Sequence, residues 1–361
     1  MRLRVAIVYN RPVPSRYDAA GEEKAVSGVL DAVGAVARSL RELDCEVSCV
    51  PLVPPAERAL EKLGALDVDL VFNLFEGFCG EPESETLVPE YLERIGVPFT
   101  GCPFATLGLC LDKARVKVLL QACGIPTPDF QLLRPETLHL FRLGYPCIVK
   151  PRGDDASHGI DETSVAGDFS TLERQVGLVS EAYGVALVEE FVGGREFNAT
   201  VLGGNRGTVL PPSEIVYSLP PELPRILTFS AKWEPDSPYY RGTRAVCPAE
   251  IETWERECLG TTARAVYRLL GYRGYARVDM RMDDRGQLHV IEVNPNPDIS
   301  PGAGAARQAA AAGMDYTRFI EKIIHIALEK EEHGRQDSSY TEKRQAVPDA
   351  AAAAHTRVQA V

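Results

Sequence analysis

Two apolar segments late in the sequence carry carboxylate, amide and guanidinium groups at alternating positions. Glu292 and Asn294 are two residues apart in VIEVN, and Arg277 and Asp279 are two residues apart in YARVDM. Side chains alternate along a strand, so the members of each pair share one face. A hairpin that turns around DDRG brings Asp279 nearly opposite Glu292, at the spacing of about 5 Å between cross-strand neighbours.

This group of charges has two interpretations. Two carboxylates so close together raise one pKa and destabilise the fold unless a positive charge lies between them. A Mg²⁺ ion removes this repulsion, because it prefers carboxylate and amide oxygens together with substrate phosphates. Alternatively, the group is a solvated face on which Arg277 pairs with one of the acids. The hairpin alone leaves both interpretations open.

The composition is typical of a globular protein that acts on small molecules. The 361 residues suffice for two or three domains, and the net charge of −12 argues against binding to nucleic acid or anionic membranes. No apolar run approaches the ~20 residues of a membrane span, and the first run is too short for a signal peptide. The nine scattered cysteines, without a CxxC pair, indicate a reducing cytoplasm.

The order of strand and helix patterns indicates the fold class. Over about the first 100 residues, apolar strand patterns and amphipathic helix patterns alternate, which predicts a Rossmann-like parallel sheet. The predicted elements include a helix over 21–44 and a short strand over 97–102. No GxGxxG follows the first strand, so the dinucleotide fingerprint is absent. From Leu111 the pattern changes to α+β, including a possible partner strand over 159–165.

Five segments in order resemble the ATP-grasp superfamily and, within it, the D-alanine–D-alanine ligases. They are LDKARVKVLLQACGIPTP, CIVKPRGDDASHGI, LVEEFVGGREFN, SAKW and the hairpin GYARVDM to VIEVNPNP. GVPFTGC and FNLFEG also resemble segments of the ligases' N-terminal domain. The resemblance implies a Rossmann-like N-terminal domain followed by a two-lobed ATP-grasp fold. We expect the N-terminal domain at 1–104, the central lobe at 105–187, the C-terminal lobe at 188–332 and a disordered tail at 333–361.

The resemblance also implies a reaction. ATP phosphorylates a carboxylate to an acylphosphate, an amine attacks it, and an amide forms with release of ADP and phosphate. The implied cofactors are ATP and two Mg²⁺ ions, the partners are small-molecule carboxylate and amine substrates, and a homodimer is possible. Two other interpretations stay open. They are a D-alanine–D-alanine ligase with an altered pocket and a nucleotide-binding module that has lost catalysis.

Individual residues take roles only through this resemblance. Asp279, Glu292 and Asn294 are implied to bind Mg²⁺, and Arg277 to stabilise the oxyanion of the tetrahedral intermediate. Lys150 and Lys232 join Arg277 as catalytic residues. The residues implied to bind the nucleotide are Lys113 and Lys150 at the phosphates, Lys232 at the transferred phosphoryl group, Ser157 in the phosphate loop, Glu189 and Val192 at adenine, and Glu196 at the ribose.

Two of these assignments have plain alternatives. Lys113 could be a solvated lysine in the first turn of its helix. One of Glu189 and Glu190 is expected to be a surface acid at the end of its strand. Asp154 and Asp155, beside the phosphate loop, either bind a metal or a basic substrate group or are simply solvated.

The sequence departs from the ligases at the expected substrate pocket. Glu23 matches the glutamate that recognises the first D-alanine, whereas Ala156 replaces the loop serine and Trp233 replaces a tyrosine. In NPNPDISPGAG, Asp298 stands where the ligases have a glycine near the carboxylate of the second D-alanine. A carboxylate there repels that group by on the order of 1 kcal/mol. We therefore expect an amine other than D-alanine, larger or cationic, with Asp298 as its partner.

Overall fold

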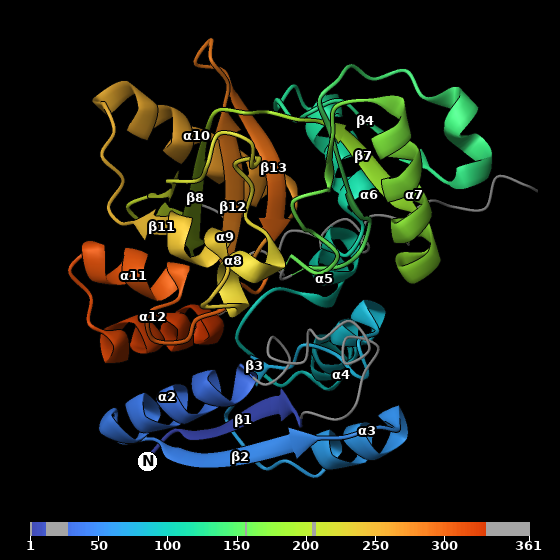
Figure 1. Cartoon of the computed structure of the whole chain (residues 1–361). Helices are drawn as coiled ribbons and strands as arrows, with labels where there is room; N and C mark the ends of the chain where they lie inside the picture. The colour runs from blue at the N-terminus through green and yellow to red at the C-terminus, as the bar shows by residue number, and fades with distance from the viewer. Residues whose placement is uncertain (1, 12–27, 156, 204–206, 330–361) are drawn as a thin grey trace, which may run out of the picture. The chain divides into compact units, whose positions relative to one another are not determined.

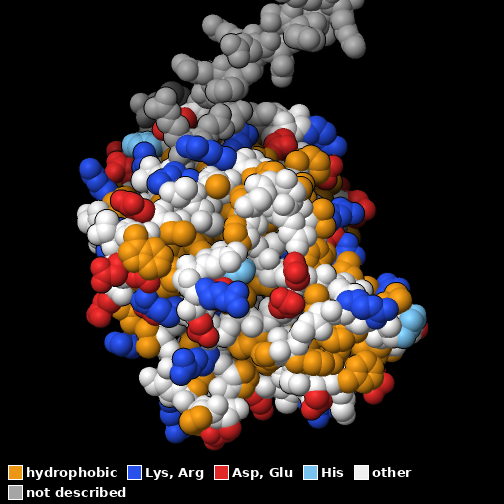
Figure 2. All heavy atoms as spheres, turned by 90° about the horizontal axis from the view of Figure 1, so that it is seen from above, with side chains coloured by type: hydrophobic (Ala, Val, Ile, Leu, Met, Phe, Trp, Pro, Cys, Tyr) orange, Lys and Arg blue, Asp and Glu red, His pale blue; other side chains and the backbone are white. Residues whose placement is uncertain are grey.

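The computed structural model describes residues 2–11, 28–155, 157–203 and 207–329. Met1–Ala327 form one unit, which contains three β-sheets, and Leu328–Val361 form a second unit. The predicted tail at 333–361 lies outside the described residues. In the described part of the chain, no helix is both long and apolar enough to cross a membrane. On the face that Figure 2 shows, Lys and Arg side chains are scattered among acidic ones and do not form one basic patch.

The N-terminal part contains a parallel sheet with strand order β2-β1-β3 (Figure 1). Its central strand is almost entirely buried, as an apolar run between helices requires. This part confirms the predicted strand–helix alternation, although residues 21–27 of the predicted first helix lie outside the described residues. Its elements are β1 (Arg4–Asn10), α2 (Val29–Glu42), β2 (Glu46–Leu52), α3 (Ala56–Gly64), β3 (Leu70–Leu74), η2 (Pro82–Thr86), α4 (Leu87–Ile95) and α5 (Phe104–Cys110).

The short strand predicted over 97–102 is wrong. Only one isolated bridge forms there, between Phe99 and Val71. Pairing stops after the two hydrogen bonds on either side of this bridge, because Gly101 takes φ +94° and turns the chain away.

The central sheet is antiparallel, with strand order β4-β7-β5-β6, and α7 packs against it. The strand predicted over 159–165 is largely wrong, since only Val165–Ala166 pair. Asp161 accepts hydrogen bonds from the backbone N–H and hydroxyl of Thr163, both at 2.7 Å, and this local turn competes with the sheet. The elements are α6 (Lys113–Ala122), β4 (Phe130–Leu133), η3 (Pro135–Leu140), β5 (Cys147–Pro151), β6 (Val165–Ala166), α7 (Phe169–Tyr183) and β7 (Ala186–Glu190).

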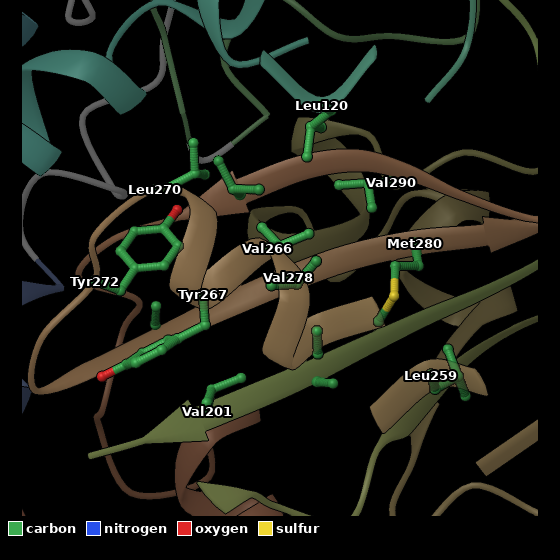
Figure 3. Close-up of a cluster of buried hydrophobic side chains, with 14 of the residues drawn as sticks. Leu120, Val201, Leu259, Val266, Tyr267, Leu270, Tyr272, Val278, Met280 and Val290 are labelled. Atoms are coloured by element: carbon green, nitrogen blue, oxygen red, sulfur yellow. The ribbon is translucent and has the colours of Figure 1, made fainter. Parts of the chain in front are cut away.

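The third sheet has strand order β11-β10-β8-β12-β13, with β9 paired to β8. Its core lies under α10, where Val266 lies beside Val278 of β12 and Tyr267 lies near Tyr272 (Figure 3). The elements are β8 (Arg195–Leu202), β9 (Thr208–Val209), β10 (Ser213–Tyr217), α8 (Phe229–Trp233), α9 (Pro238–Gly242), β11 (Thr243–Val246), α10 (Thr253–Leu269), β12 (Tyr275–Met282), β13 (Leu288–Asn294), α11 (Gly304–Ala311) and α12 (Tyr316–Leu328).

Two elements connect the three sheets. Leu120 of α6 belongs to the same core as Val290 of β13, so this helix packs on the third sheet (Figure 3). Phe319 and Ile320 of α12 share a second core with Ile7 of the N-terminal sheet. Both contacts fix the positions of the strand ends that carry the candidate site. The domain boundaries at 104, 187 and 332 stay a prediction.

Candidate active site

The β12–β13 hairpin has the predicted register. Asp279 pairs with Glu292 and Arg277 pairs with Asn294, and a bulge directly after Asp279 shifts the pairing by one residue. Arg277 Nε and Nη2 donate to the two oxygens of Asp279, both at 2.7 Å, and Asn294 Nδ2 donates to Asp279 Oδ2 at 3.1 Å. Arg277 therefore pairs with an acid, as in the solvated-face interpretation. This face is not solvated, however, since both side chains of that pair are less than a quarter exposed.

Glu292 lies among lysines from three other elements. Lys113 Nζ at the start of α6 lies 3.1 Å from Glu292 Oε1 and 2.9 Å from Asp155 Oδ1. Burial would raise the pKa of Glu292, but the charges of Lys113, Lys150 and Lys232 outweigh it and lower this pKa to about 2. Lys113 is only 8% exposed, so its interpretation as a solvated lysine is wrong. Glu292 is thus a fixed negative charge in a positive environment.

Helix caps hold two of these lysines in place. The side chain of Asp112 accepts hydrogen bonds from the backbone N–H groups of residues 114 and 115 and also pairs with Arg152, which fixes the first turn of α6 and Lys113 with it. Thr228 caps α8 by accepting from the N–H of residue 231 at 3.1 Å, and this short helix carries Lys232. Burial and the charge of Arg277 lower the pKa of Lys232.

A second buried cluster joins Lys150 and Lys117 through one carboxylate. Glu189 Oε1 lies 2.9 Å from Lys150 Nζ and 3.3 Å from Lys117 Nζ, and Glu189 is only 2% exposed. Its neighbour Glu190 is exposed, so one of the two is a surface acid, as expected. Sequence reasoning missed Lys117. The available signal was its position four residues after Lys113, which places both lysines on one face of the helix.

A third buried group surrounds Glu196. Its Oε2 accepts from Arg281 Nε at 3.1 Å, from Arg281 Nη2 at 2.5 Å and from the hydroxyl of Tyr217 at 2.7 Å. Arg281 Nη1 also donates to the carbonyl of Val192 at 2.7 Å, which ties together two residues predicted to bind the nucleoside. Arg281 was missed, although it follows Arg277 and Asp279 at alternating positions along β12. Ser157 directs its hydroxyl to the carbonyl of Leu227 at 2.8 Å.

A cavity of about 390 Å³ brings several predicted residues together. Asp298, which is exposed and accepts a 2.7 Å hydrogen bond from Ser300 N–H, lines it from the segment after β13. Trp233 lines it from α8, whereas Glu23 and Ala156 lie outside the described residues. The other predicted residues that line this cavity are Lys232, Arg277, Glu292 and Asn294.

The donor set at the hairpin suits Mg²⁺ bound together with a phosphate. In the parts of the chain that the structure describes, no group of three or more His, Cys, Asp or Glu side chains could hold a metal ion by itself. The site offers two carboxylates and one amide, at Asp279, Glu292 and Asn294. Mg²⁺ commonly takes one or two carboxylates and completes its shell with water and substrate phosphates. The arrangement therefore fits a metal that arrives with a nucleotide.

Comparison with known proteins identifies the family. The family model described as the D-ala D-ala ligase C-terminus matches residues 119–325, which is more than half of the chain. The chain belongs to the D-alanine–D-alanine ligase family. It is therefore an ATP-grasp ligase, an enzyme class that forms C–N bonds.

Relatives of the D-alanine–D-alanine ligase family cover most of this chain. A D-alanine–D-alanine ligase of Actinobacillus succinogenes is 30% identical over 286 residues, which is 76% of this chain and 86% of that protein. An uncharacterised protein of Sinorhizobium fredii, y4sG, is 35% identical over 263 residues, which is 72% of this chain and 74% of that protein. The chain thus matches an uncharacterised protein as well as named ligases.

Solved structures of the D-alanine–D-alanine ligase family share this fold. A D-alanine–D-alanine ligase from Bacillus anthracis superposes with a TM-score of 0.71 at 24% identity, over 90% of this chain and 97% of that one. The VanG D-Ala:D-Ser ligase from Enterococcus faecalis superposes with a TM-score of 0.69 at 20% identity, over 91% of this chain and all of the other. The predicted fold, a Rossmann-like domain followed by an ATP-grasp fold, is confirmed.

Proposed function

We propose that this ligase uses ATP and two Mg²⁺ ions to join a small-molecule carboxylate to an amine other than D-alanine, through an acylphosphate. The observation that carries this proposal is the position of Glu292. It lies opposite Asp279 on the hairpin and is surrounded by the positive charges of Lys113, Lys150 and Lys232. Carboxylates beside several fixed cations are what a phosphoryl-transfer site needs, because both metal and phosphate must be held there.

The lysines are suited to holding the phosphates of ATP. Lys113 and Lys150 approach the hairpin from α6 and β5, and Lys232 approaches from α8. A compact ammonium tolerates the changing geometry of a phosphoryl group in transfer better than a planar guanidinium does. Glu189 keeps Lys150 oriented through its 2.9 Å contact. We assign adenine to Glu189 and Val192, the ribose to Glu196, and the phosphate loop to Ser157.

Asp279, Glu292 and Asn294 would hold the metal ions. When bound, Mg²⁺ neutralises charge on the phosphoryl oxygens. Arg277 uses Nε and one Nη2 N–H for Asp279, so three of the five N–H donors of its guanidinium are left for the oxyanion of the tetrahedral intermediate. The Asp279 contact therefore orients Arg277 and does not exhaust it.

The position of Asp298 supports the proposal that the acceptor is an amine other than D-alanine. Asp298 lines the same cavity as Arg277 and Lys232, so an acceptor that reaches the reacting carbon passes near its carboxylate. Repulsion of on the order of 1 kcal/mol weakens binding of an amino acid carboxylate there. The family relationship supports the competing candidate, a D-alanine–D-alanine ligase with an altered pocket. Glu23 would recognise an amino group of the first substrate in either case.

ADP release by the purified chain tests the function. A panel of carboxylates is paired with a panel of amines that includes D-alanine, and turnover is expected with an amine other than D-alanine. Efficient D-Ala-D-Ala formation would establish the competing candidate. ATP binding without ADP release from any pair would indicate a nucleotide-binding module that has lost catalysis. Glu292→Ala is expected to abolish turnover while the surface variant Glu257→Gln does not.

Two further proposals concern the state of the protein. The nine cysteines are all free, which suits a reducing cytoplasm as the location of the protein.

A homodimer is the assembly we expect, because dimers are common among the ligases that the sequence resembles. Light scattering of the purified chain gives the mass that tests this, and a monomeric mass would contradict it.

A further inference from the structure

The candidate cavity contains a cluster of acidic side chains that the proposed binding of metal and phosphate does not use. Glu76 lines it from the loop after β3, Glu85 from η2, and Asp298 from the segment after β13. In the described part of the chain, none of these three carboxylates forms an ion pair with a Lys, Arg or His side chain. Phosphates and metal ions are already accounted for by the lysines and the hairpin, so this acidic wall requires a separate explanation.

The positive side chains that line the cavity do not neutralise the wall. Arg277 is held by Asp279, and Lys232 lies in the field of Glu292, Asp279 and Asp155. Arg11 also lines the cavity, but no ion pair joins it to a carboxylate within the described residues. Within the described residues, none of these cations forms an ion pair with Glu76, Glu85 or Asp298.

The carboxylates of the wall also act on one another. Burial raises the pKa of Glu85 to about 8, and the charges of Asp155 and Glu76 add to this effect. Glu76 is exposed at the surface of the cavity, and loss of solvation within the cavity, with the charge of Asp298, raises its pKa. A ligand with positive charge relieves this repulsion and favours the ionised form of each group.

An unpartnered buried donor in the same cavity points independently to a ligand. Asn73, at 2% exposed, lines the cavity; its Oδ1 accepts from Phe75 N–H at 3.2 Å. Its Nδ2 is buried and has no hydrogen-bond acceptor within the described residues. Buried polar groups without partners are uncommon because they cost free energy, so a neutral oxygen on a ligand would satisfy this amide.

We propose that the acceptor amine carries a second positive charge, bound by Glu76, Glu85 and Asp298, and a neutral oxygen in place of a carboxylate. An amide of a basic amino acid has this chemistry: its carbonyl oxygen accepts from Asn73, and its distal ammonium faces the three acids. This inference rests on the proposed ligase function, because it identifies the class of amine that the ligase uses.

Two matched probes isolate the second charge. Lysinamide and norleucinamide share the reacting amine and the amide carbonyl, and only lysinamide carries a distal ammonium. Each is titrated calorimetrically into the full chain with Mg²⁺ and a non-hydrolysable ATP analogue. We expect lysinamide to bind at least about tenfold more tightly than norleucinamide. Lysine, which restores the carboxylate, is expected to bind several-fold more weakly than lysinamide.

Two variants link this preference to the wall. Glu85→Gln and Glu76→Gln are each expected to reduce the preference for lysinamide to less than about threefold. Glu257→Gln, on the exposed side of α10, is expected to keep it in full. Thermal melts confirm that each variant is folded, and if one wall variant does not fold, the other is tested alone.

The outcomes separate this inference from the proposed function. Equal binding of the two amides by the folded wild-type chain overturns the inference, and so does a preference that survives both wall substitutions. In the separate turnover assay with ATP, ADP release with neutral amines still supports the ligase function. Preferential binding of lysinamide without ADP release from any carboxylate supports the charge selectivity and overturns the ligase function.

Discussion

Removing the charge of Glu292 is the most informative perturbation of this site. Glu292→Gln keeps the size of the side chain but leaves Lys113, Lys150 and Lys232 without their common negative neighbour. Within the described residues, Lys113 then keeps Asp155 as its one carboxylate partner, at 2.9 Å. The variant is compared with the wild-type chain in the presence of a metal chelator, so that a bound cation does not contribute to the difference.

The expected magnitude follows from the pKa of Glu292. The lysines lower it from 4.5 to about 2, and each pKa unit corresponds to roughly 1.4 kcal/mol of stabilisation of the charged form. Because the side chain is 28% exposed and solvent screens part of the interaction, we expect Glu292→Gln to lose about 2 kcal/mol at pH 7.

The sign of the pH dependence is fixed by the direction of this shift. A carboxylate whose pKa is lower in the folded state stabilises the fold above its unfolded value, near pH 4.5. That contribution is lost as the pH falls from 4.5 toward 2. The difference in stability between wild type and variant should therefore be constant from pH 7 to pH 5 and narrow below pH 4.5.

Urea unfolding at a series of pH values between 7 and 3 measures this difference. Glu257→Gln serves as the control, because its side chain is exposed on α10 and does not line the cavity. A Glu292→Gln variant as stable as wild type at pH 7 would refute the electrostatic account. A difference that does not narrow below pH 4.5 would show that packing, and not charge, causes it.

Three further predictions concern the groups that support the site. In a double-mutant cycle of Arg281→Met and Glu196→Gln measured by urea unfolding, we expect a coupling of at least about 1.5 kcal/mol, because the pair is buried; additive effects would contradict this. Burial lowers the pKa of Lys117 to about 8. The free energy of unfolding of the wild type should therefore rise by on the order of 1 kcal/mol from pH 8 to pH 10, because the buried ammonium loses its proton more readily in the folded state than in the unfolded state. Lys117→Met should lack this gain, and an equal gain in both would disprove the assignment. Asp112→Ala should cost about 1 kcal/mol through loss of the α6 cap, seen as a lower Tm.

The hairpin could be predicted from the sequence because its information is local. Alternation along two apolar strands and a turn at DDRG fix which side chains share a face, and a shift by one residue would bury the charged ones. Asp279 and Glu292 accordingly lie opposite each other. The bulge after Asp279 changes the pairing only from Met280 onward, so the pairing of Arg277 and Asp279 with β13 is unaffected.

The supporting contacts could not be predicted in the same way, because they join distant parts of the chain. Glu196 and Arg281 lie on strands 85 residues apart, and only the assembled sheet shows that they meet. The helical spacing of Lys117 places it beside Lys113, which the sequence indicates. The sequence does not indicate that Glu189 approaches Lys117 from another strand. Glu76 and Glu85 are nine residues apart in the sequence, and only the folded chain places both at one cavity.

The arrangement of charges in this site allows Lys113 to exchange its carboxylate partner for a phosphate oxygen when the nucleotide and metal bind. Glu292 pairs with Lys113 and interacts electrostatically with Lys150 and Lys232, the lysines that the proposed function assigns to phosphates. It is also assigned to a metal ion. Both assignments are compatible if Lys113 exchanges Glu292 for a phosphate oxygen, which frees the carboxylate for the metal that accompanies the nucleotide. Asp279, which accepts two hydrogen bonds from Arg277, would keep this guanidinium oriented. Since an exchange of partners leaves few buried charges alone, the site avoids the several kcal/mol that an unpaired buried ion costs.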